Sequence, residues 1–386
     1  MSGPRLFLIA GEASGDRLGA SLMRALRVEA PDAVFGGVGG EAMRAEGLAP
    51  VFDIRALAVM GLTEVLPRLP TILRLLRRAT EAALAFRPDA LITIDSPSFS
   101  LRVAKRVRAA APGVRTVHYV APSVWAWRPG RAARMARHVA HVLALLPFEP
   151  PYMRAAGMGC DFVGHPIAEA PVATEAEARG FRERHGLGDA PLLLVAPGSR
   201  MGELRRLGPL FADVVARRGA TRPGLRTVVP VAWTVEDAVE GLFPNALRLG
   251  RETGEAERRA AMAAADAALL KSGTITLEAA AAGTPQVAAY RASVLTAAMV
   301  RWLIRVDTGN LVNLAVGWED GARPVPEFYQ EAATPAALAG ALGPLLDGGP
   351  EREAQRAAAD LALRRLGRGG PASSTRAARS VLAALG

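Results

Sequence analysis

The sequence predicts an α/β protein built from two Rossmann-like domains that face each other across a cleft. Three observations lead to this prediction. The chain has 386 residues, which at roughly 150 residues per domain suggests about two domains. Short apolar runs rich in β-branched residues alternate with helical segments, an order typical of right-handed βαβ units and a parallel sheet. A stretch rich in proline and acidic residues interrupts this order, which then starts again.

The N-terminal half alternates between strands and helices. Its strands are expected at residues 5–11, 33–40, 90–96, 115–123 and 141–147. Its main helices are expected at residues 12–30 (after a turn), 41–47, 70–86 and 101–113, and a turn is expected at 162–166. Gly47 is expected to end the short second helix, because glycine is favoured just past a helix C-terminus.

Residues 165–178 are expected to form the linker between the two halves. Beyond it, strands are expected at 191–200, 225–233, 246–250, 264–273 and 284–291, with helices between them, and an alanine- and arginine-rich helical stretch from about residue 334. The expected domains are therefore 1–168, 169–345 and a set of C-terminal helices at 346–386. These helices pack back on the first domain or on a partner chain, which leaves both a monomer and a homodimer open.

Cysteine and histidine usage excludes several classes of site. Cys160 is the single cysteine, which excludes a disulfide scaffold, an iron–sulfur cluster and a cysteine-rich zinc site; we expect it to be a small buried hydrophobe. His138 and His141 are three residues apart, but no further ligands converge on them, and His165 is expected to be structural. No D-x-D or Gly-x-Ser-x-Gly motif is present. We therefore expect no metal, no cofactor and no serine-hydrolase site.

The net charge of +10 favours anionic partners such as nucleotides, phosphosugars or anionic lipid surfaces. No basic block with interleaved aromatic residues is present, so a nucleic-acid partner is not expected. The sequence begins without a signal-peptide pattern and contains no apolar run of the roughly 18 residues that a membrane span needs. These features predict a cytoplasmic protein.

Two loops of the first half carry candidate catalytic groups. The loop from Gly11 to Asp16, with Glu12, Ser14 and Gly15, joins a strand to a helix, where glycines allow close approach and the helix N-terminus favours an anion. A plain tight turn, with Asp16 as a helix N-cap, is the alternative. Asp95 ends a predicted strand, where a carboxylate can accept a proton from a hydroxyl; the alternative is an aspartate that caps the next helix.

The segment from His118 to Arg128 contains Trp125 and Trp127, two of the five tryptophans of the chain. Trp125 is interpreted as the wall of a sugar or acyl-chain site. The alternative is a structural plug.

Three motifs of the second half suit a nucleoside diphosphate. Gly198, Ser199 and Arg200 follow a strand, and a forked guanidinium can neutralise a diphosphate without a metal; an ordinary surface arginine is the alternative. A second predicted strand ends in a turn whose N–H groups can hold phosphate oxygens, followed by an acid that can accept both hydroxyls of a ribose. The residues of this motif are Ser272, Gly273, Thr274 and Glu278.

Asn310 and Asn313 lie three residues apart near Gly309. Their amides can bind a base or a phosphate, or they cap a helix. The spacing leaves both interpretations open.

Taken together, these motifs resemble the lipid-A-disaccharide synthase family, bacterial glycosyltransferases with two Rossmann-like domains (the GT-B type). The resemblance covers nearly the whole chain and rests on GEASGD (11–16), VMGLTEVLPRL (59–69), IDSPSF (94–99), HYVAPSVWAWR (118–128), LPFE (146–149), FVGHP (162–166), PGSR (197–200), SGTITLE (272–278) and NLVNL (310–314). Ala13 and Ala121 stand where the family often has threonine and serine, and the asparagine segment lacks the proline of the family version.

The resemblance implies a reaction of lipid A biosynthesis at the inner membrane. The 6-hydroxyl of 2,3-diacylglucosamine 1-phosphate attacks the anomeric carbon of UDP-2,3-diacylglucosamine with inversion, giving a β-1,6-linked disaccharide and UDP. Asp95 is the expected base, and Glu12 and Asp16 are further catalytic candidates beside Ser14 and Gly15 on the acceptor side. The donor is expected to contact Arg200 and Ser199 together with the turn that begins at Ser272.

Acylated substrates imply contact with a membrane surface. Residues 56–79 are strongly apolar with interspersed arginines, which resembles an interfacial element; a core-facing helix is the alternative. The run 293–306 has the same ambiguity. The other functions considered are a UDP-sugar epimerase, another GT-B glycosyltransferase, and a non-catalytic protein that binds nucleotide-sugars or phospholipids.

Overall fold

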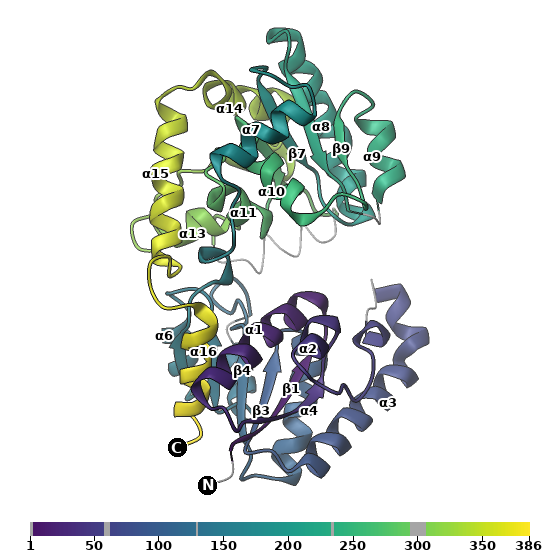
Figure 1. The fold of residues 1–386 in the computed structure, drawn as a ribbon, viewed down its shortest axis with the longest axis vertical. Coiled ribbons are helices and arrows are strands. Elements are labelled where there is room, and N and C mark those ends of the chain that lie inside the picture. Colours follow the sequence, from purple (N-terminus) through teal and green to yellow (C-terminus); the bar gives the residue numbers. More distant parts are fainter. Residues whose placement is uncertain (1–2, 58–61, 129, 233–234, 294–305) are drawn as a thin grey trace. The chain divides into compact units, whose positions relative to one another are not determined.

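The computed structural model describes residues 3–57, 62–128, 130–232, 235–293 and 306–386 (Figure 1), and for residues 62–68 it describes the backbone alone. The chain forms two compact units. Unit 1 contains the residues up to Pro166 together with Gly369–Gly386, and unit 2 contains Ile167–Arg368. The predicted run 293–306 lies almost entirely outside the described residues.

Unit 1 has one parallel sheet whose described strands follow the order β2-β1-β3-β4-β5-β6. The strands are β1 (Arg5–Ala10), β2 (Val34–Val38), β3 (Ala90–Ile94), β4 (Arg115–Tyr119), β5 (His141–Ala144) and β6 (Gly159–Phe162). The helices are α1 (Ala13–Glu29), α2 (Glu41–Ala45), α3 (Leu62–Phe86), α4 (Pro97–Ala110), α5 (Gly130–Ala136), α6 (Pro150–Arg154) and α16 (Ser373–Ala383), with a 3₁₀ turn at Ile54–Leu57.

Alternation along β1 explains why helices cover both faces of this sheet. Leu6 and Leu8 pack in one apolar cluster with α1 and α16, whereas Phe7 and Ile9 pack in another with α3 and α4. Successive side chains of a strand point to opposite faces, so a strand that is apolar at every position must be covered on both sides. The continuous apolar run of β1 therefore requires a helical layer on each face.

Unit 2 has a second parallel sheet, in the order β12-β11-β10-β7-β8-β9 among the described strands. The strands are β7 (Leu192–Ala196), β8 (Arg226–Pro230), β9 (Leu247–Leu249), β10 (Ala267–Lys271), β11 (Gln286–Tyr290) and β12 (Glu327–Tyr329). The helices are α7 (Glu175–Arg184), α8 (Met201–Thr221), α9 (Glu236–Leu242), α10 (Glu255–Ala264), α11 (Ile275–Ala281), α13 (Leu311–Gly317), α14 (Pro335–Asp347) and α15 (Pro350–Arg365). Short 3₁₀ turns occur at Pro166–Ala168 and Gln330–Ala332.

Helix α14 shows how local sequence determines an element of unit 2. The hydroxyl of Thr334 accepts a hydrogen bond from the backbone N–H of Ala337 at 3.2 Å, and Pro335 occupies the first turn, where its missing N–H has no cost. Gly348 ends the helix with φ of +77°, a left-handed conformation that glycine adopts without a steric penalty.

The C-terminal helices predicted at 346–386 are divided between the two units. Helix α15 packs on α13 and α11 in unit 2, and α16 packs on α1 in unit 1 (Figure 1). Ser380 of α16 donates to Asp161 Oδ2 at 2.6 Å, and its Oγ lies 2.9 Å from His141 Nε2. His141, considered above as a metal ligand, therefore helps to hold the last helix on the sheet.

Both sheets end in an edge strand that the sequence analysis missed. Neither β6, which lies directly before and at the start of the predicted turn 162–166, nor β12 was predicted as a strand. Each is short and only partly buried, and each pairs with a single neighbour, β5 or β11. Their apolar runs are too short to be recognised without the partner strand.

Two predicted helix boundaries were also wrong. Helix α3 begins at Leu62, before the proline that was expected to start it. Helix α7 begins at Glu175, inside the predicted linker 165–178. There Thr174 and Glu177 form a reciprocal capping box, with hydrogen bonds of 3.2 Å and 2.7 Å. A capping box supplies two of the N–H groups at a helix start with acceptors, so the helix begins despite the polar composition.

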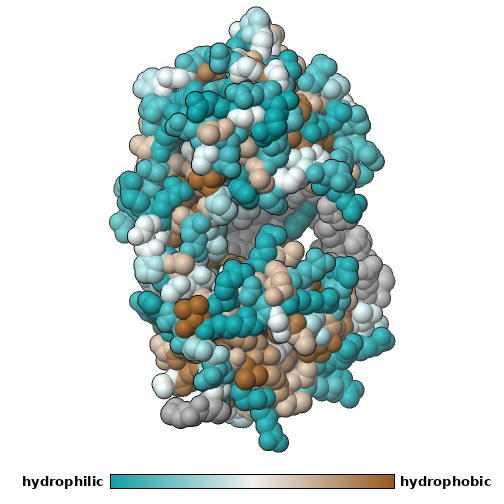
Figure 2. All heavy atoms as spheres, in the orientation of Figure 1, coloured by the Kyte–Doolittle hydropathy of each residue, from teal (hydrophilic) through white to brown (hydrophobic). Residues whose placement is uncertain are grey.

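On the face drawn in Figure 2, hydrophilic residues dominate unit 2, and apolar patches are more frequent on unit 1.

No described helix is long and apolar enough to cross a membrane.

Candidate active site

The order of strands defines one candidate crevice in each sheet, at the point where the strand order reverses. In unit 1, β2 lies on one side of β1 and β3 lies on the other, so the strand order reverses between β1 and β3. The candidate crevice therefore lies beyond the carboxyl ends of these two strands. In unit 2 the same reversal occurs between β7 and β10. Ligands of open α/β sheets bind where the strand order reverses. The four loops predicted from sequence, which begin at Gly11, Asp95, Pro197 and Ser272, follow these four strands.

Asp95 occupies a strained turn at the end of β3. Asp95 and Ser96 both have positive φ, +48° and +42°. Hydrogen bonds hold this turn, because Asp95 N donates to Tyr119 O at 2.9 Å and Ser100 Oγ donates to Asp95 O at 2.6 Å. Two consecutive non-glycine residues in this region cost energy, and such strain is concentrated at functional sites. The half-buried Asp95 carboxylate has no hydrogen-bond or ion-pair partner among the described residues.

The loops after β1 and β3 touch each other. A Cβ atom added at Gly11 would lie 2.7 Å from both Cβ and Oγ of Ser96, so only glycine fits at this position. Ser96 Oγ is itself buried without a partner in the described part of the chain. Glu12 and Ser14 are exposed at the start of α1, and Gly15 packs against Ile94 O, which a Cβ would approach to 3.3 Å. The β1 loop therefore lies beside the Asp95 turn.

The carboxylate of Asp16, predicted as a catalytic candidate, is engaged by the backbone of a neighbouring helix. Its carboxylate is 5% exposed and accepts hydrogen bonds from the backbone N–H groups of Gly40, Ala42 and Met43 at 2.6, 2.9 and 3.2 Å. These N–H groups belong to the start of α2, so Asp16 caps a neighbouring helix and not its own. Both carboxylate oxygens are engaged by the main chain, which does not support a role in proton transfer.

Trp125, predicted as a substrate wall with a structural plug as the alternative, is buried in unit 1. It is 9% exposed, donates from Nε1 to Glu149 Oε1 at 3.2 Å, and packs edge-on against Phe148. Glu149 also accepts from the backbone N–H groups of Leu145 and Leu146. Trp127, stacked with Arg128, is the half-buried member of the tryptophan pair.

Glu149 predicts a pH dependence of stability. Burial raises the pKa of Glu149 from 4.5 to about 7, so the folded protein binds this proton more tightly than the unfolded chain does. The stabilisation is fully present below pH 4.5 and is lost as the pH rises through 7. Between pH 4.5 and 7 the unfolding free energy of the wild type should therefore fall. In Glu149→Gln we expect this fall to be smaller by about 2–3 kcal/mol. Urea unfolding at a series of pH values measures this, with the exposed Glu81→Gln as control; equal slopes in wild type and Glu149→Gln would contradict it.

Three further titratable groups of unit 1, His118, Cys160 and His165, have pKa values that burial shifts. His118 lies 1% exposed, with Nδ1 2.8 Å from Thr93 Oγ1, and burial lowers its pKa to about 3. Burial likewise lowers the pKa of His165 to about 4. It raises the pKa of the Cys160 thiol to about 12. Among the described residues, no group of three or more acidic, cysteine or histidine side chains is placed to hold a metal.

Glu203 links the two loops of the unit 2 crevice. Its Oε2 accepts from Ser199 N at 3.1 Å, and its Oε1 lies 3.1 Å from Lys271 Nζ. Gly198 has φ of +126°, and a Cβ there would lie 2.6 Å from Glu203 Cβ, so this turn requires glycine. The turn after β7 is therefore tied through Glu203 to the end of β10, a connection that sequence spacing does not reveal.

Arg200 is the N-cap residue of α8 and is exposed. Its guanidinium has no hydrogen-bond or ion-pair partner among the described residues. In contrast, the guanidinium of Arg206 on the same helix donates to Gly202 O. A free guanidinium at a helix N-terminus beside a reversal of strand order is suited to an anion.

The turn after β10 meets a carboxylate that the sequence analysis missed. Ser272 is 7% exposed and donates its hydroxyl hydrogen to Glu327 Oε1, so this hydrogen is not free for a phosphate. Gly273 and Thr274 follow at the start of α11, and Thr274 is exposed and makes no side-chain cap. Glu278 is exposed in the first turn of the same helix.

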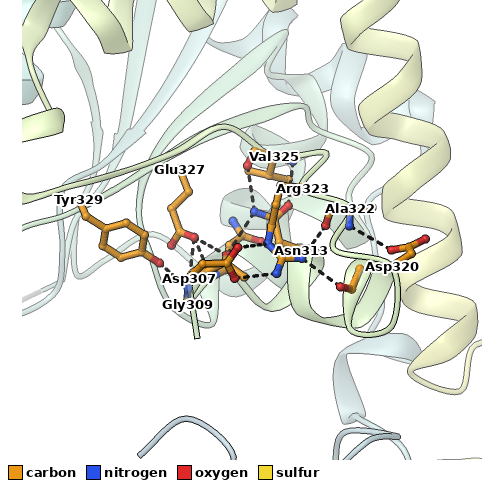
Figure 3. Close-up of polar contacts among 12 residues, drawn as sticks. Asp307, Gly309, Asn313, Asp320, Ala322, Arg323, Val325, Glu327 and Tyr329 are labelled. Atoms are coloured by element: carbon orange, nitrogen blue, oxygen red, sulfur yellow. Dashed lines mark hydrogen bonds and ion pairs between the residues drawn. The ribbon is translucent and has the colours of Figure 1, made fainter. Parts of the chain in front are cut away.

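The two candidate asparagines differ in their remaining hydrogen-bonding capacity. Asn313 is 1% exposed, and its amide exchanges two hydrogen bonds of 2.9 Å with the backbone of Val325 (Figure 3). Asn310 caps α13 with Oδ1 at 2.9 Å from Val312 N, and its Nδ2 is buried with no described partner. The contacts therefore favour Asn310 over Asn313 as the residue that meets a ligand.

Comparison with known proteins identifies the family. The family model described as lipid-A-disaccharide synthetase matches residues 6–379. A lipid-A-disaccharide synthase of Ruegeria pomeroyi is 50% identical over 98% of this chain and 94% of its own length, and that of Rhodospirillum centenum is 45% identical over the same shares.

Solved structures show the same fold at low identity. A UDP-GlcNAc 2-epimerase of Neisseria meningitidis bound to UDP-GlcNAc has a TM-score of 0.65 at 11% identity and covers 99% of both chains. The enzyme of Methanocaldococcus jannaschii, in complex with UDP-GlcNAc and UDP, has a TM-score of 0.62 at 13% identity and covers 98% of this chain and 99% of its own. The two parallel sheets and these structural neighbours show that the fold is of the GT-B type. The family match over residues 6–379 and the similar relatives show that the chain belongs to the lipid-A-disaccharide synthetase family, glycosyltransferases of lipid A biosynthesis.

Proposed function

We propose that the protein transfers a diacylglucosamine unit from UDP-2,3-diacylglucosamine to the 6-hydroxyl of 2,3-diacylglucosamine 1-phosphate, with inversion at the anomeric carbon. The observation that carries this proposal is a pair of charged groups, one in each unit, that have no hydrogen-bond or ion-pair partner among the residues that the structure describes. The Asp95 carboxylate follows a strand at the unit 1 crevice, and the Arg200 guanidinium follows one at the unit 2 crevice.

Asp95 has the chemistry of the base. In a single displacement, the acceptor 6-hydroxyl gives its proton to the carboxylate while its oxygen forms a bond to the anomeric carbon of the donor. The bond from that carbon to the diphosphate oxygen breaks, and the electron pair leaves with UDP. The strained turn supports this role because it holds the carboxylate at the carboxyl end of β3 without a competing partner.

Arg200 supports the departure of UDP. Its guanidinium places positive charge where the diphosphate gains negative charge, and such stabilisation is often the largest contribution to catalysis. The backbone N–H groups of Gly273 and Thr274 and the hydroxyl of Thr274 supply further donors, and Asn310 Nδ2 supplies a buried one. Glu278 is the proposed acceptor for the ribose hydroxyls.

Product analysis tests this function directly. Incubation with the UDP-linked donor and the acylated monosaccharide phosphate should yield a disaccharide phosphate and one UDP per disaccharide. An epimerase would instead convert the donor sugar without an acceptor, and a non-catalytic binding protein would leave both compounds unchanged. Mass spectrometry of the products distinguishes the three results, and either of the last two would overturn the proposed reaction.

Helix α3 supports a contact with the membrane surface. Of the predicted element 56–79, residues 58–61 lie outside the described residues. On the described part of α3, Leu75 and Leu76 are buried in the core, whereas Leu69 and Leu73 are 40% and 44% exposed. Arg74 and Arg77 are exposed beside them. The helix therefore combines a core-facing side with an apolar side flanked by arginines, which suits an anionic lipid surface.

The apolar side of α3 leads to a prediction for vesicle binding. We expect the protein to float with vesicles that contain anionic lipid at low salt and to float less at high salt, because salt screens the arginines. The double substitution Leu69→Ser with Leu73→Ser should weaken binding by about 10-fold or more, since each leucine contributes roughly 1.5–3 kcal/mol when buried. Val28→Ser on α1, at a residue that is 77% exposed, is the matched control. Equal flotation of the double variant and this control would count against the lipid contact.

A further inference from the structure

Glu327, the first residue of β12, receives hydrogen bonds from two loops that are distant in sequence. Ser272 Oγ donates to Oε1 at 2.5 Å. Thr308 Oγ1 donates to Oε2 at 2.5 Å, and the backbone N–H groups of Gly309 and Asn310 donate to the same oxygen at 3.2 Å (Figure 3). One carboxylate thus joins the turn after β10 to the segment that leads into α13.

The cluster around Glu327 is closely packed. Gly309 N also donates to the hydroxyl of Tyr329, and a Cβ added at Gly309 would lie 3.2 Å from that hydroxyl and 3.8 Å from Ser272 Oγ. Burial and the neighbouring Glu327 raise the pKa of Tyr329, so this phenol stays neutral. These contacts leave the two loops little freedom to separate while Glu327 is in place.

No cation neutralises Glu327 among the described residues. Lys271 pairs with Glu203, and Arg323 pairs with Asp307 at 2.6 Å. The charge of Glu327 is instead stabilised by the four neutral donors, two hydroxyls and two backbone N–H groups. A carboxylate that attracts donors from both loops orders them.

Asn310 shows what this ordering achieves. Its backbone N–H is held by Glu327 and its Oδ1 by the start of α13, so the direction of its amide is determined from both sides. The remaining donor, Nδ2, is buried and has no described partner. A buried unsatisfied donor is costly in the free protein and is satisfied when a ligand supplies an oxygen.

We propose that Glu327 is a positioning residue for the nucleotide donor. It holds the Ser272–Thr274 turn beside Asn310, so that the backbone N–H groups of Gly273 and Thr274 and the Nδ2 of Asn310 are arranged before the diphosphate arrives. This inference rests on the proposed function, because it takes the donor of that reaction as the ligand. Glu327 itself does not touch the donor. Its effect is on donor affinity, since donors that are already oriented need not be ordered during binding.

Titration of UDP against variants at Glu327, with a matched control, tests this role. We expect Glu327→Ala to weaken UDP binding, measured by calorimetry, by about 10- to 100-fold, the range expected when hydrogen bonds to a charged group are lost. Glu327→Gln keeps the size and one acceptor oxygen, so it should recover most of the affinity. Asp307→Asn is the matched control: it removes the same charge two residues from Gly309, from a carboxylate that pairs with Arg323, and should leave UDP affinity unchanged.

Steady-state kinetics separate positioning from general structural support. A positioning role raises KM for the UDP-linked donor strongly in Glu327→Ala and only slightly in Glu327→Gln, and it leaves KM for the acceptor unchanged in both. Because Glu327→Ala is the variant most exposed to misfolding, Ser272→Ala provides a milder test that removes one hydrogen bond from the opposite side, and it should show the same donor-specific change.

The outcomes are distinct. If wild-type protein binds UDP and all three substitutions at Glu327 and Ser272 lower the melting temperature without changing UDP affinity or donor KM, Glu327 is structural only and the inference is overturned. If wild-type protein does not bind UDP at all, the proposed function itself fails, and the inference fails with it.

Discussion

Replacing Asp95 with asparagine should lower kcat by about 10²- to 10⁴-fold, the usual contribution of a general base, and should leave UDP binding intact. The physical reason is that asparagine cannot accept the proton of the acceptor hydroxyl, although it has nearly the same shape as aspartate. Asparagine also tolerates positive φ, so the turn at +48° persists. Because the carboxylate has no described partner, the substitution breaks no interaction of the fold. Steady-state turnover with both substrates and UDP calorimetry measure the two effects.

Asp89→Asn is the control for this experiment. Asp89 precedes the same strand at its opposite end, where Oδ2 accepts from Arg5 N at 2.7 Å, and asparagine can still accept that hydrogen bond. Its kcat should match wild type. Near-normal turnover in Asp95→Asn would remove Asp95 from the role of base, whereas an equal loss in both variants would point to damage of β3 and not to lost proton transfer.

Replacing Arg200 with alanine should weaken UDP binding and raise donor KM by about 10- to 100-fold, because hydrogen bonds to charged groups contribute roughly 1.5–3 kcal/mol. The effect should decrease at high salt, since Arg200 is exposed and its charge is screened. Arg200→Lys should fall between wild type and alanine, because lysine keeps the charge but lacks the planar fork that grips two oxygens.

Arg206→Ala removes an equal charge from the same helix and should leave UDP affinity at the wild-type value. Its guanidinium donates to Gly202 O at 2.8 Å, within α8. If Arg200→Ala binds UDP as tightly as Arg206→Ala does, the diphosphate role of Arg200 is wrong, and the donors of the Ser272–Thr274 turn would have to carry that charge alone.

Much of the fold could be predicted from sequence because its determinants are local. The strands β1, β3, β7 and β10 are short, mainly apolar runs, and the structure finds each of them inside the segment that the pattern predicts. Edge strands β6 and β12 were missed because an edge strand needs few apolar residues and owes its conformation to pairing with a neighbour. The early start of α7 depends on one capping pair, a signal that is present in the sequence but small.

The sequence alone was sufficient to select the loops of the candidate site, since each polar motif directly follows a strand and parallel strands bring their carboxyl ends to one edge. It could not decide which polar groups remain available. Asp16 is engaged by backbone 24 residues away, Asn313 by Val325 12 residues away, and Ser272 by Glu327 55 residues away. A hydrogen-bonding group is satisfied by whatever tertiary folding brings within about 3 Å, and linear spacing does not encode that distance. Only the tertiary structure therefore separated Asp95 and Arg200, whose side chains have no partner in the described part of the chain, from side chains of the same chemistry that hold the fold together.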